Sequence, residues 1–506
     1  MSQPALTDAA EGEPDATDQA DGTAPEATSE ATTEEVPPKR GLRERLRRTP
    51  LELVILAAIA AVTRFATLGS PRAIVFDEVF FREWALSYKA GTFYFDIHPP
   101  LGKLLLGAWG ALAGVDATAM STDPAVALRI LPALAGTLLI IVVYILIRQL
   151  CGSRKVATFG AGLLLLDNAL LVESRLTLID SMLLLFGMSA VVVALAARQR
   201  TGRAYWWLLA ASAALAGCAV ATKVSGLTAF GLIGLIWLAD VIRERRSWRP
   251  VLGQAVVLGL VPATVFVMTF AIHFALLPKS GGNYDNYMPT EFKATLQGNP
   301  GYNADAERSF PQKFADLNKA MQDGQLSLST GSHPYASKWS SWPIMKRGIF
   351  LYLKPAADGK IRYIYTLGNP VVWWGTLLGA LVVVIGLIAR PRRFAPYKWA
   401  LILLAIGWAA NYLPFAFIDR PMFLYHYLFA LIFSVAFVSI GIGVLTGWIK
   451  EDDDHPWSFP SRWSEGVYWA VLGAALLSFL YFAPLTYALP LTNDGLESRM
   501  WLSTWR

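Results

Sequence analysis

The sequence predicts an all-α integral membrane protein, built as a multi-spanning bundle of about eleven transmembrane helices. Of its 506 residues, 54% are hydrophobic and 16% are charged, whereas a soluble chain carries roughly 25% charged residues. Apolar stretches long enough to cross a bilayer, which takes about 20 residues, recur throughout the chain. Basic residues gather at alternate connections between these stretches. The solvent of most of the chain is therefore expected to be lipid.

Apolar length places the predicted spans in order along the chain. They lie near 51–69, 126–148, 155–172, 176–197, 204–222, 224–241, 252–276, 370–389, 397–416, 421–448 and 466–489. The connections inside two pairs, 155–172 with 176–197 and 204–222 with 224–241, are very short.

The orientation follows from the charges of the connections. Alternation places five short connections on one side, namely Arg148–Lys155, Arg198–Arg203, Arg243–Arg249, Arg390–Lys398 and Lys450–Arg462. All five carry Lys or Arg, which indicates the cytoplasmic side. We expect a multi-pass protein of the plasma membrane with a cytoplasmic N-terminus and an extracytoplasmic C-terminus.

Composition divides the chain into parts. Residues 1–38 hold ten acidic and no basic residues, with few large apolar side chains, and predict a disordered cytoplasmic tail. The remaining residues carry all 44 basic and 28 acidic residues, a net charge of +16 that indicates topology and anionic headgroups, with no nucleic-acid motif. The later parts are an N-terminal transmembrane module (39–276), a long extracytoplasmic loop (277–369), a C-terminal transmembrane module (370–490) and an extracytoplasmic tail (491–506).

Two outer segments are long enough to carry a site. The first outer loop, 70–125, contains an apolar stretch at 101–114 that is too short to span and is expected to form an interfacial helix. The second, 277–369, is rich in Gly, Asn, Ser, Tyr and Pro, and internal loops of this length are usually functional.

Ionisable residues gather at the outer ends of the predicted spans. A charge in hydrocarbon costs roughly 2.5–3.5 kcal/mol on insertion scales, so charges that persist there mark pairs, cavities or sites. The residues concerned are Asp77, Glu78, Asp96, His98, Arg129, Glu173, Arg175, Asp180, Lys223, Asp419, Arg420 and His426. Their common depth predicts one site open to the exterior, with carboxylates for proton transfer and cations for an anion.

Structural explanations compete with these roles. Asp77 and Glu78 suit a helix start, although their apolar neighbourhood, AIVFDEVFF, favours a function. Arg129 is equally consistent with snorkelling to headgroups, and Arg175 with Asp180 is consistent with an ion pair that ties two helices.

Lys223 favours function, because an outer-face anchor is less often Lys. His98 precedes two prolines and is also consistent with shaping a turn, and His273 is interpreted as an interfacial histidine. Cys151 and Cys218 have no CxxC spacing and predict two buried thiols.

Seven motifs occur along the chain in the same order as in a known protein family. They are FDEVFF (76–81), YFDIHPPLGKLL (94–105), LVESRLTLIDSML (171–183), ATKVSGL (221–227), SHPYASKWSSWP (332–343), IYTLGNPVVWW (364–374) and RPMFLYHYLFAL (420–431). From about 50 to 490 the chain resembles the protein O-mannosyltransferases that use polyprenyl-phosphate-mannose. The loop 277–369 has no room for the β-trefoil domain of eukaryotic members, and the resemblance is to the actinobacterial type.

The resemblance implies the membrane glycosyltransferase (GT-C) architecture and transfer of mannose to Ser or Thr of exported proteins, with inversion at the sugar. It assigns Asp77 as general base, and we give Glu78 an acceptor-binding or orienting role. A leaving phosphate needs cations. The candidates for binding the donor phosphate and sugar are Lys223, Arg129, Arg175, Arg420, His426 and Asp180, and those for positioning the acceptor and its loop are Asp96, His98, His333 and Tyr335.

No cofactor is required by this reading. Asp77, Glu78 and His98 offer ligands for a divalent cation, but a singly phosphorylated donor among basic residues does not need one, and we predict no metal. The expected partners are the lipid donor, secreted or membrane protein acceptors that are coupled to the export machinery, and membrane lipids, with no nucleic acid. Two alternatives are a glycosyltransferase that acts on a lipid or cell-wall glycan and a multi-pass transporter.

Overall fold

A computed structural model describes residues 50–115, 126–245, 247–328, 333–450 and 455–506. The predicted tail at 1–38 and the basic run that follows it lie outside these ranges. The long helices are α2 (Leu51–Phe65), α5 (Ile130–Cys151), α6 (Arg154–Leu165), α7 (Asn168–Arg175), α8 (Asp180–Ala197), α9 (Gly202–Thr222), α10 (Leu227–Glu244), α11 (Trp248–Leu276), α14 (Pro370–Ala389), α16 (Lys398–Ala410), α17 (Leu428–Thr446) and α18 (Arg462–Tyr487).

These helices confirm the predicted membrane bundle. Within the described ranges, nine helical segments are long and apolar enough to cross a membrane, and α6 with α7 forms a further, bent pair. The 15-residue α2 occupies the first predicted position. The spans of α5, α8 and α17 are 61–72% buried, whereas those of α11 and α18 are 22% buried and turn large apolar side chains outward. An outward apolar belt of this kind suits a lipid solvent.

One predicted span is broken at an acidic residue. The segment 155–172 divides into α6 and α7, which meet at an angle of 63°. Between them, Asp167 accepts a hydrogen bond from the Leu170 amide and another from Trp373 Nε1. Capping the next helix and binding a distant indole satisfies this buried carboxylate.

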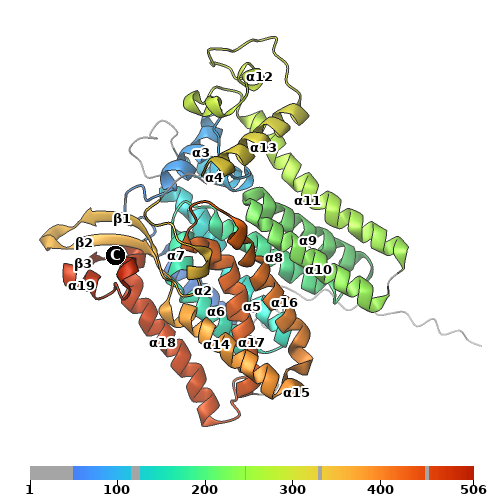
Figure 1. Cartoon of the computed structure of the whole chain (residues 1–506), viewed down its shortest axis with the longest axis vertical. Coiled ribbons are helices and arrows are strands. Elements are labelled where there is room, and N and C mark those ends of the chain that lie inside the picture. The colour runs from blue at the N-terminus through green and yellow to red at the C-terminus, as the bar shows by residue number, and fades with distance from the viewer. Residues whose placement is uncertain (1–49, 116–125, 246, 329–332, 451–454) are drawn as a thin grey trace, which may run out of the picture. The chain divides into compact units, whose positions relative to one another are not determined.

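The two long loops lie together at one end of the bundle (Figure 1). The first contributes α3 (Glu78–Ala90) and α4 (Leu101–Leu112), and the second contributes α12 (Thr290–Lys293) and α13 (Phe310–Ser327). The amide of Phe93 donates to the carbonyl of Lys279, and a buried cluster that includes Phe95, Phe270 and Leu317 joins both loops to α11. The helix predicted at 101–114 is thus present as α4.

The second loop ends in a small antiparallel sheet of order β1-β2-β3. Strand β1 (Ile349–Pro355) pairs with β2 (Ile361–Thr366), and the two-residue β3 (Pro490–Leu491) pairs with β2 after α18. In β1, Ile349 and Leu351 are buried while Phe350 and Tyr352 are half-buried, and the pairing with β2 shifts by one residue between Phe350 and Tyr352, as at a β-bulge.

Candidate active site

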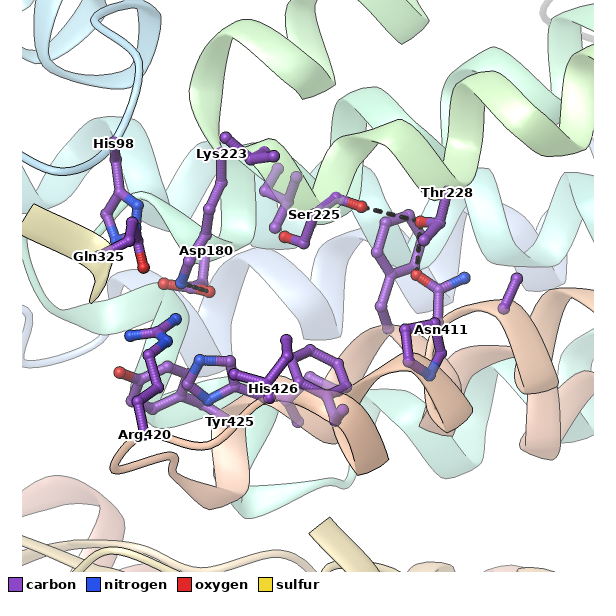
Figure 2. A pocket seen from close by; sticks show the side chains of 18 of the residues that line it. His98, Asp180, Lys223, Ser225, Thr228, Gln325, Asn411, Arg420, Tyr425 and His426 are labelled. Atoms are coloured by element: carbon purple, nitrogen blue, oxygen red, sulfur yellow. Dashed lines mark hydrogen bonds and ion pairs between the residues drawn. The ribbon is translucent and has the colours of Figure 1, made fainter. Parts of the chain in front are cut away.

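A cavity of about 540 Å³ opens beside the junctions of α8, α9 and α10 with the segment before α17. One part of its wall is polar, and Figure 2 shows His98, Asp180 and Lys223 facing Arg420 and His426. The rest of the wall is mainly apolar, with Leu183, Leu184, Val224, Phe415, Phe417, Ile418, Leu428 and Phe429. The cavity therefore suits a ligand that has a charged head and a long apolar body.

Lys223 is placed by the break between α9 and α10. The next helical turn is pressed against α9, and a Cβ on Gly226 would come within 2.3 Å of the Ala219 carbonyl carbon. The ammonium of Lys223 donates to Asp180 Oδ1 over 2.9 Å and lies 5.1 Å from the ring centre of Tyr425. An ion pair and a ring face together fix a cation at the cavity wall.

Two further cationic or donor groups come from the segment before α17. The ring of His426 stacks on Trp342 at 5.7 Å between ring centres, and its Nδ1 lies 3.2 Å from the Phe423 amide nitrogen. Arg420 makes no hydrogen bond or ion pair with any residue that the structure describes, and burial lowers the pKa of its guanidinium. An arginine in this state is available for an anionic ligand.

His98 closes the same cavity from the first loop. Burial holds the pKa of its imidazole well below the usual range, and the nearby charges of Lys223, Lys103 and Arg420 lower it further. His98 is therefore neutral, and its backbone carbonyl accepts a hydrogen bond from the Lys103 ammonium. The same ammonium donates to Asp96 Oδ2 over 2.5 Å. Lys103, which the sequence analysis did not single out, fixes the HPPLGK turn.

Asp77 directly precedes α3 and does not line the cavity. The charges of the cavity residues Lys223 and Asp180 nevertheless shift its pKa. Burial raises the pKa of Asp77 to about 6, with Lys223 lowering it and Asp180 and Asp96 raising it. Phe76, directly before it, has a φ of 49°, a left-handed backbone that bulky residues rarely adopt and that concentrates at functional sites. A carboxylate with a pKa near neutrality is suited to accept a proton.

Glu78 and Arg129 form a buried clamp instead of a ligand site. Arg129 donates from Nε and Nη2 to the two oxygens of Glu78, both over 2.7 Å, and each side chain is about 1% exposed. Its other donors reach the carbonyls of Leu68, Pro71 and Ala73. All five N–H groups of the guanidinium are committed, so the phosphate contact predicted for Arg129 is not supported.

The geometry around Glu78 also bears on its predicted acceptor role. Its oxygens accept hydrogen bonds from the backbone amides of Val75 and Thr177 as well as from Arg129. Glu78 thereby joins the first loop to the strand-like segment before α8. These bonds fix the start of α3, directly after Asp77, and the acceptor-binding or orienting role of Glu78 stays a prediction.

Arg175 is likewise committed elsewhere. Its guanidinium donates to the carbonyls of Thr63, Arg64, Ala66 and Thr67 at the end of α2 and lies 4.4 Å from the ring centre of Tyr487. The last carbonyls of a helix need such donors. The alternative ion pair with Asp180 is not present, because Asp180 pairs with Lys223, and the phosphate contact of Arg175 stays a prediction.

His333 and Tyr335 meet the first loop from the other side. The His333 ring lies 6.4 Å from that of Phe76 and 5.0 Å from that of Phe423, and its Nδ1 accepts a hydrogen bond from the Tyr335 amide. The motifs that begin at 76, 332 and 420 therefore converge, although His333 and Tyr335 do not line the cavity.

Asp77, Glu78 and His98, which the sequence offered as ligands for a divalent cation, do not form a metal site among the described residues. Over the described ranges, no three His, Cys, Asp or Glu side chains lie in an arrangement that could hold a metal ion. Glu78, one of the three candidates, has its oxygens bound to Arg129 and backbone amides. Residues that sequence reasoning missed at the cavity are Gln325, Asn411 and Thr228, which lie in none of the seven motifs, and Tyr425, which lies in the motif at 420–431 but was not singled out.

Comparison with solved structures identifies the architecture. The chain matches the S. cerevisiae protein O-mannosyltransferase Pmt1–Pmt2 complex bound to the sugar donor with a TM-score of 0.80 at 19% identity, over 92% of this chain and 93% of that one. It matches the Archaeoglobus fulgidus oligosaccharyltransferase with a TM-score of 0.52 at 14% identity, over 89% of this chain and 57% of that one. The fold is that of the GT-C membrane glycosyltransferases.

Sequence comparison gives the family. Residues 54–278 match the model described as dolichyl-phosphate-mannose-protein mannosyltransferase, and residues 310–505 match the C-terminal four-transmembrane region of protein O-mannosyltransferase. The chain belongs to the protein O-mannosyltransferase family.

Individual relatives differ in how much of their length is matched. A Mycobacterium tuberculosis polyprenol-phosphate-mannose–protein mannosyltransferase is 26% identical over 89% of this chain and 91% of its own length. Protein O-mannosyltransferase 1 of Drosophila pseudoobscura is 35% identical over 48% of this chain and 29% of its own length. The chain spans about a third of the length of the first curated relatives that it matches.

Proposed function

We propose that this protein transfers mannose from polyprenyl-phosphate-mannose to Ser or Thr hydroxyls of exported proteins. The observation that carries the proposal is the cavity, whose cationic wall continues into an apolar one beside a carboxylate of raised pKa. The mycobacterial relative, named for transfer from polyprenol-phosphate-mannose to protein, supports the same donor and acceptor.

The two ends of the donor differ in chemistry, and each matches a different part of the cavity wall. Lys223, Arg420 and His426 surround the phosphate and stabilise the charge that grows on it as the sugar leaves. The apolar wall, with Phe417, Ile418 and the residues around them, takes the start of the prenyl chain. Asp180, held by Lys223, accepts hydrogen bonds from hydroxyls of the sugar.

Asp77 acts as the general base. The acceptor hydroxyl attacks C1 of mannose on the face opposite the phosphate, while Asp77 takes its proton. The new C1–O bond forms as the bond from C1 to the phosphate oxygen breaks, and its electron pair stays on the phosphate. One direct displacement through an oxocarbenium-like state converts a β-linked donor into an α-mannoside without a covalent enzyme intermediate.

The proposed function also requires a particular orientation of the protein in the membrane. The basic connections predict that the end of the bundle with the cavity is extracytoplasmic and that the protein lies in the plasma membrane. Acceptors then reach the site as they leave the cell, which suits coupling to the export machinery. Modification of single cysteines placed in the two long loops by an impermeant reagent on intact cells tests this orientation.

A transfer assay separates this function from the lipid or cell-wall alternative. Membranes that contain the protein are incubated with radiolabelled polyprenyl-phosphate-mannose and a Ser/Thr-rich peptide. We expect label in the peptide at a rate that depends on the protein. Label that appears only in lipid or glycan would overturn the proposal.

Substitution of Lys223 by Met should weaken the phosphate contact. Removing one preorganised charge that faces a developing anion costs about 3 kcal/mol, or about 100-fold in kcat/KM. The measurement is transfer to a peptide at several donor concentrations. Lys313→Met, on α13 outside the cavity lining, is the control and should keep the wild-type rate, and an unchanged rate for Lys223→Met would remove this residue from the donor site.

The rate of transfer should depend on pH through Asp77. Its pKa of about 6 lies above the ordinary value, so the base is protonated and inactive at low pH. We expect kcat/KM to rise about tenfold per pH unit below 6 and to level off above it. The profile is measured with a saturating peptide and limiting donor. A flat profile between pH 5 and about 7 would contradict the assignment of this group as the base.

A further inference from the structure

Aromatic rings lead away from Asp77 toward the β-sheet in contact with one another. The ring of Phe76 touches that of His333, His333 touches Tyr335, Tyr335 stacks on Phe350, and Phe350 touches Tyr363. Each step between ring centres measures 5.7–6.4 Å. We call these five residues the aromatic strip.

The strip is not part of the core. All five of its side chains are half-buried, whereas Ile349 and Leu351 on the alternate positions of β1 are buried. The half-buried rings therefore leave part of their surface open to a ligand.

Basic residues border the strip. Arg347 lies 6.0 Å from the ring centre of Tyr335, and Lys354 pairs across the sheet with Arg362. Between 338 and 362 the chain has six basic residues and one acidic residue. The Nε atom of Arg347 is buried and has no hydrogen-bond partner among the described residues, so its guanidinium has a donor to offer.

We propose that the aromatic strip binds the residues that flank the acceptor hydroxyl, and that it selects extended, neutral or acidic peptide segments. The inference rests on the proposed function, because the acceptor enters it only if the hydroxyl comes to Asp77. An extended chain repeats its side chains on one face about every 6.6 Å, close to the spacing of the rings. Aromatic grooves bind extended segments in this way.

The same chemistry would also suit anionic lipid headgroups, since aromatic and basic residues gather at membrane surfaces. The position of the strip favours the peptide. It begins at Phe76, the residue next to Asp77, and the ring of His333 lies against that of Phe76. Binding of a lipid headgroup does not require a row of rings that ends beside Asp77.

The test compares a blocked tripeptide with a central Thr and longer peptides of roughly nine residues, which reach about 30 Å when extended. The longer peptides carry Glu or Lys on the flanks of the same Thr. For Phe350→Leu we expect a loss of about tenfold in kcat/KM with the longer Glu peptide, through KM, and a much smaller loss with the tripeptide. Tyr302→Leu, an exposed ring of the same loop that lies outside the strip, is the matched control and should change neither.

Charge gives a second readout. The wild-type protein should prefer the Glu peptide to the Lys peptide, and Arg347→Gln together with Lys354→Gln should reduce that preference about threefold. Measurement in nanodiscs of neutral phosphatidylcholine, with and without anionic lipid, separates the two ligands. A variant effect that requires anionic lipid and leaves the peptide preference intact would favour headgroups and overturn the inference.

Different outcomes would exclude peptide binding by the strip and mannosyl transfer to protein. Equal losses with the tripeptide and the longer peptide, or no loss for Phe350→Leu, would overturn the strip alone. A wild-type protein that mannosylates neither peptide while it labels lipid would overturn the proposed function and the strip with it.

Discussion

Replacement of Asp77 by Asn is expected to reduce transfer by about 10³-fold, the largest effect on activity that the structure predicts. Asn keeps the size of the side chain but cannot accept the proton of the hydroxyl. Because Asp77 lies beside the cavity and does not line it, donor binding should persist. The measurement is kcat for mannosyl transfer to a peptide, together with retention of a labelled donor by the purified variant.

Asp323→Asn is the matched control for this substitution. Asp323 lies on α13 at the same end of the bundle, in an exposed pair with Lys319, and its loss should leave transfer unchanged. Transfer at the wild-type rate by Asp77→Asn would remove the base from the proposed mechanism. Loss of both transfer and donor binding would move Asp77 from proton transfer to the donor site.

Replacement of Glu78 by Gln should give the largest loss of stability. The side chains of Glu78 and Arg129 are each about 1% exposed, so the substitution leaves a buried guanidinium without its counter-charge. Breaking a buried pair in this way costs about 3–5 kcal/mol of folding free energy. Thermal unfolding of the purified protein in detergent should show a clearly lower Tm, with loss of activity that follows loss of the fold.

Two comparisons make this prediction specific. Glu497→Gln removes a charge from an exposed pair with Arg506 and should change the free energy of unfolding by less than about 1 kcal/mol. The double variant Glu78→Gln/Arg129→Met removes the stranded charge and should be less destabilised than Glu78→Gln. A Glu78→Gln variant as stable as the wild type would contradict the clamp and return Glu78 to a ligand-binding role.

The bundle was predictable from the sequence because long apolar segments have few alternatives in lipid. The break between α6 and α7 was not, since the groups that hold Asp167 in a helix end are Trp373 and Asn369, some 200 residues away. The sheet was missed for a similar reason. Its strand β3 comes from the end of the chain and pairs with β2 through two residues only.

The sequence predicted the location of the site better than it predicted the contacts of each residue. Lys223, Asp180, Arg420, His426 and His98 surround one cavity, as their common position at span ends predicted, and their roles remain predictions. Arg129 and Arg175 share that position but bind backbone carbonyls and a buried carboxylate. The sequence alone does not distinguish an arginine that stabilises the fold from one that binds a phosphate. Every residue carries a backbone carbonyl, so the acceptors of a structural arginine cannot be recognised from side-chain patterns.

The central claim is that charged residues from distant segments bind one lipid-linked sugar beside Asp77. A structure of the protein with polyprenyl-phosphate-mannose, determined by electron cryomicroscopy in nanodiscs, tests it most directly. We expect the phosphate among Lys223, Arg420 and His426, the prenyl chain along Phe417 and Ile418, and C1 of mannose turned toward Asp77. A donor bound elsewhere, or one whose C1 faces away from Asp77, would contradict the account.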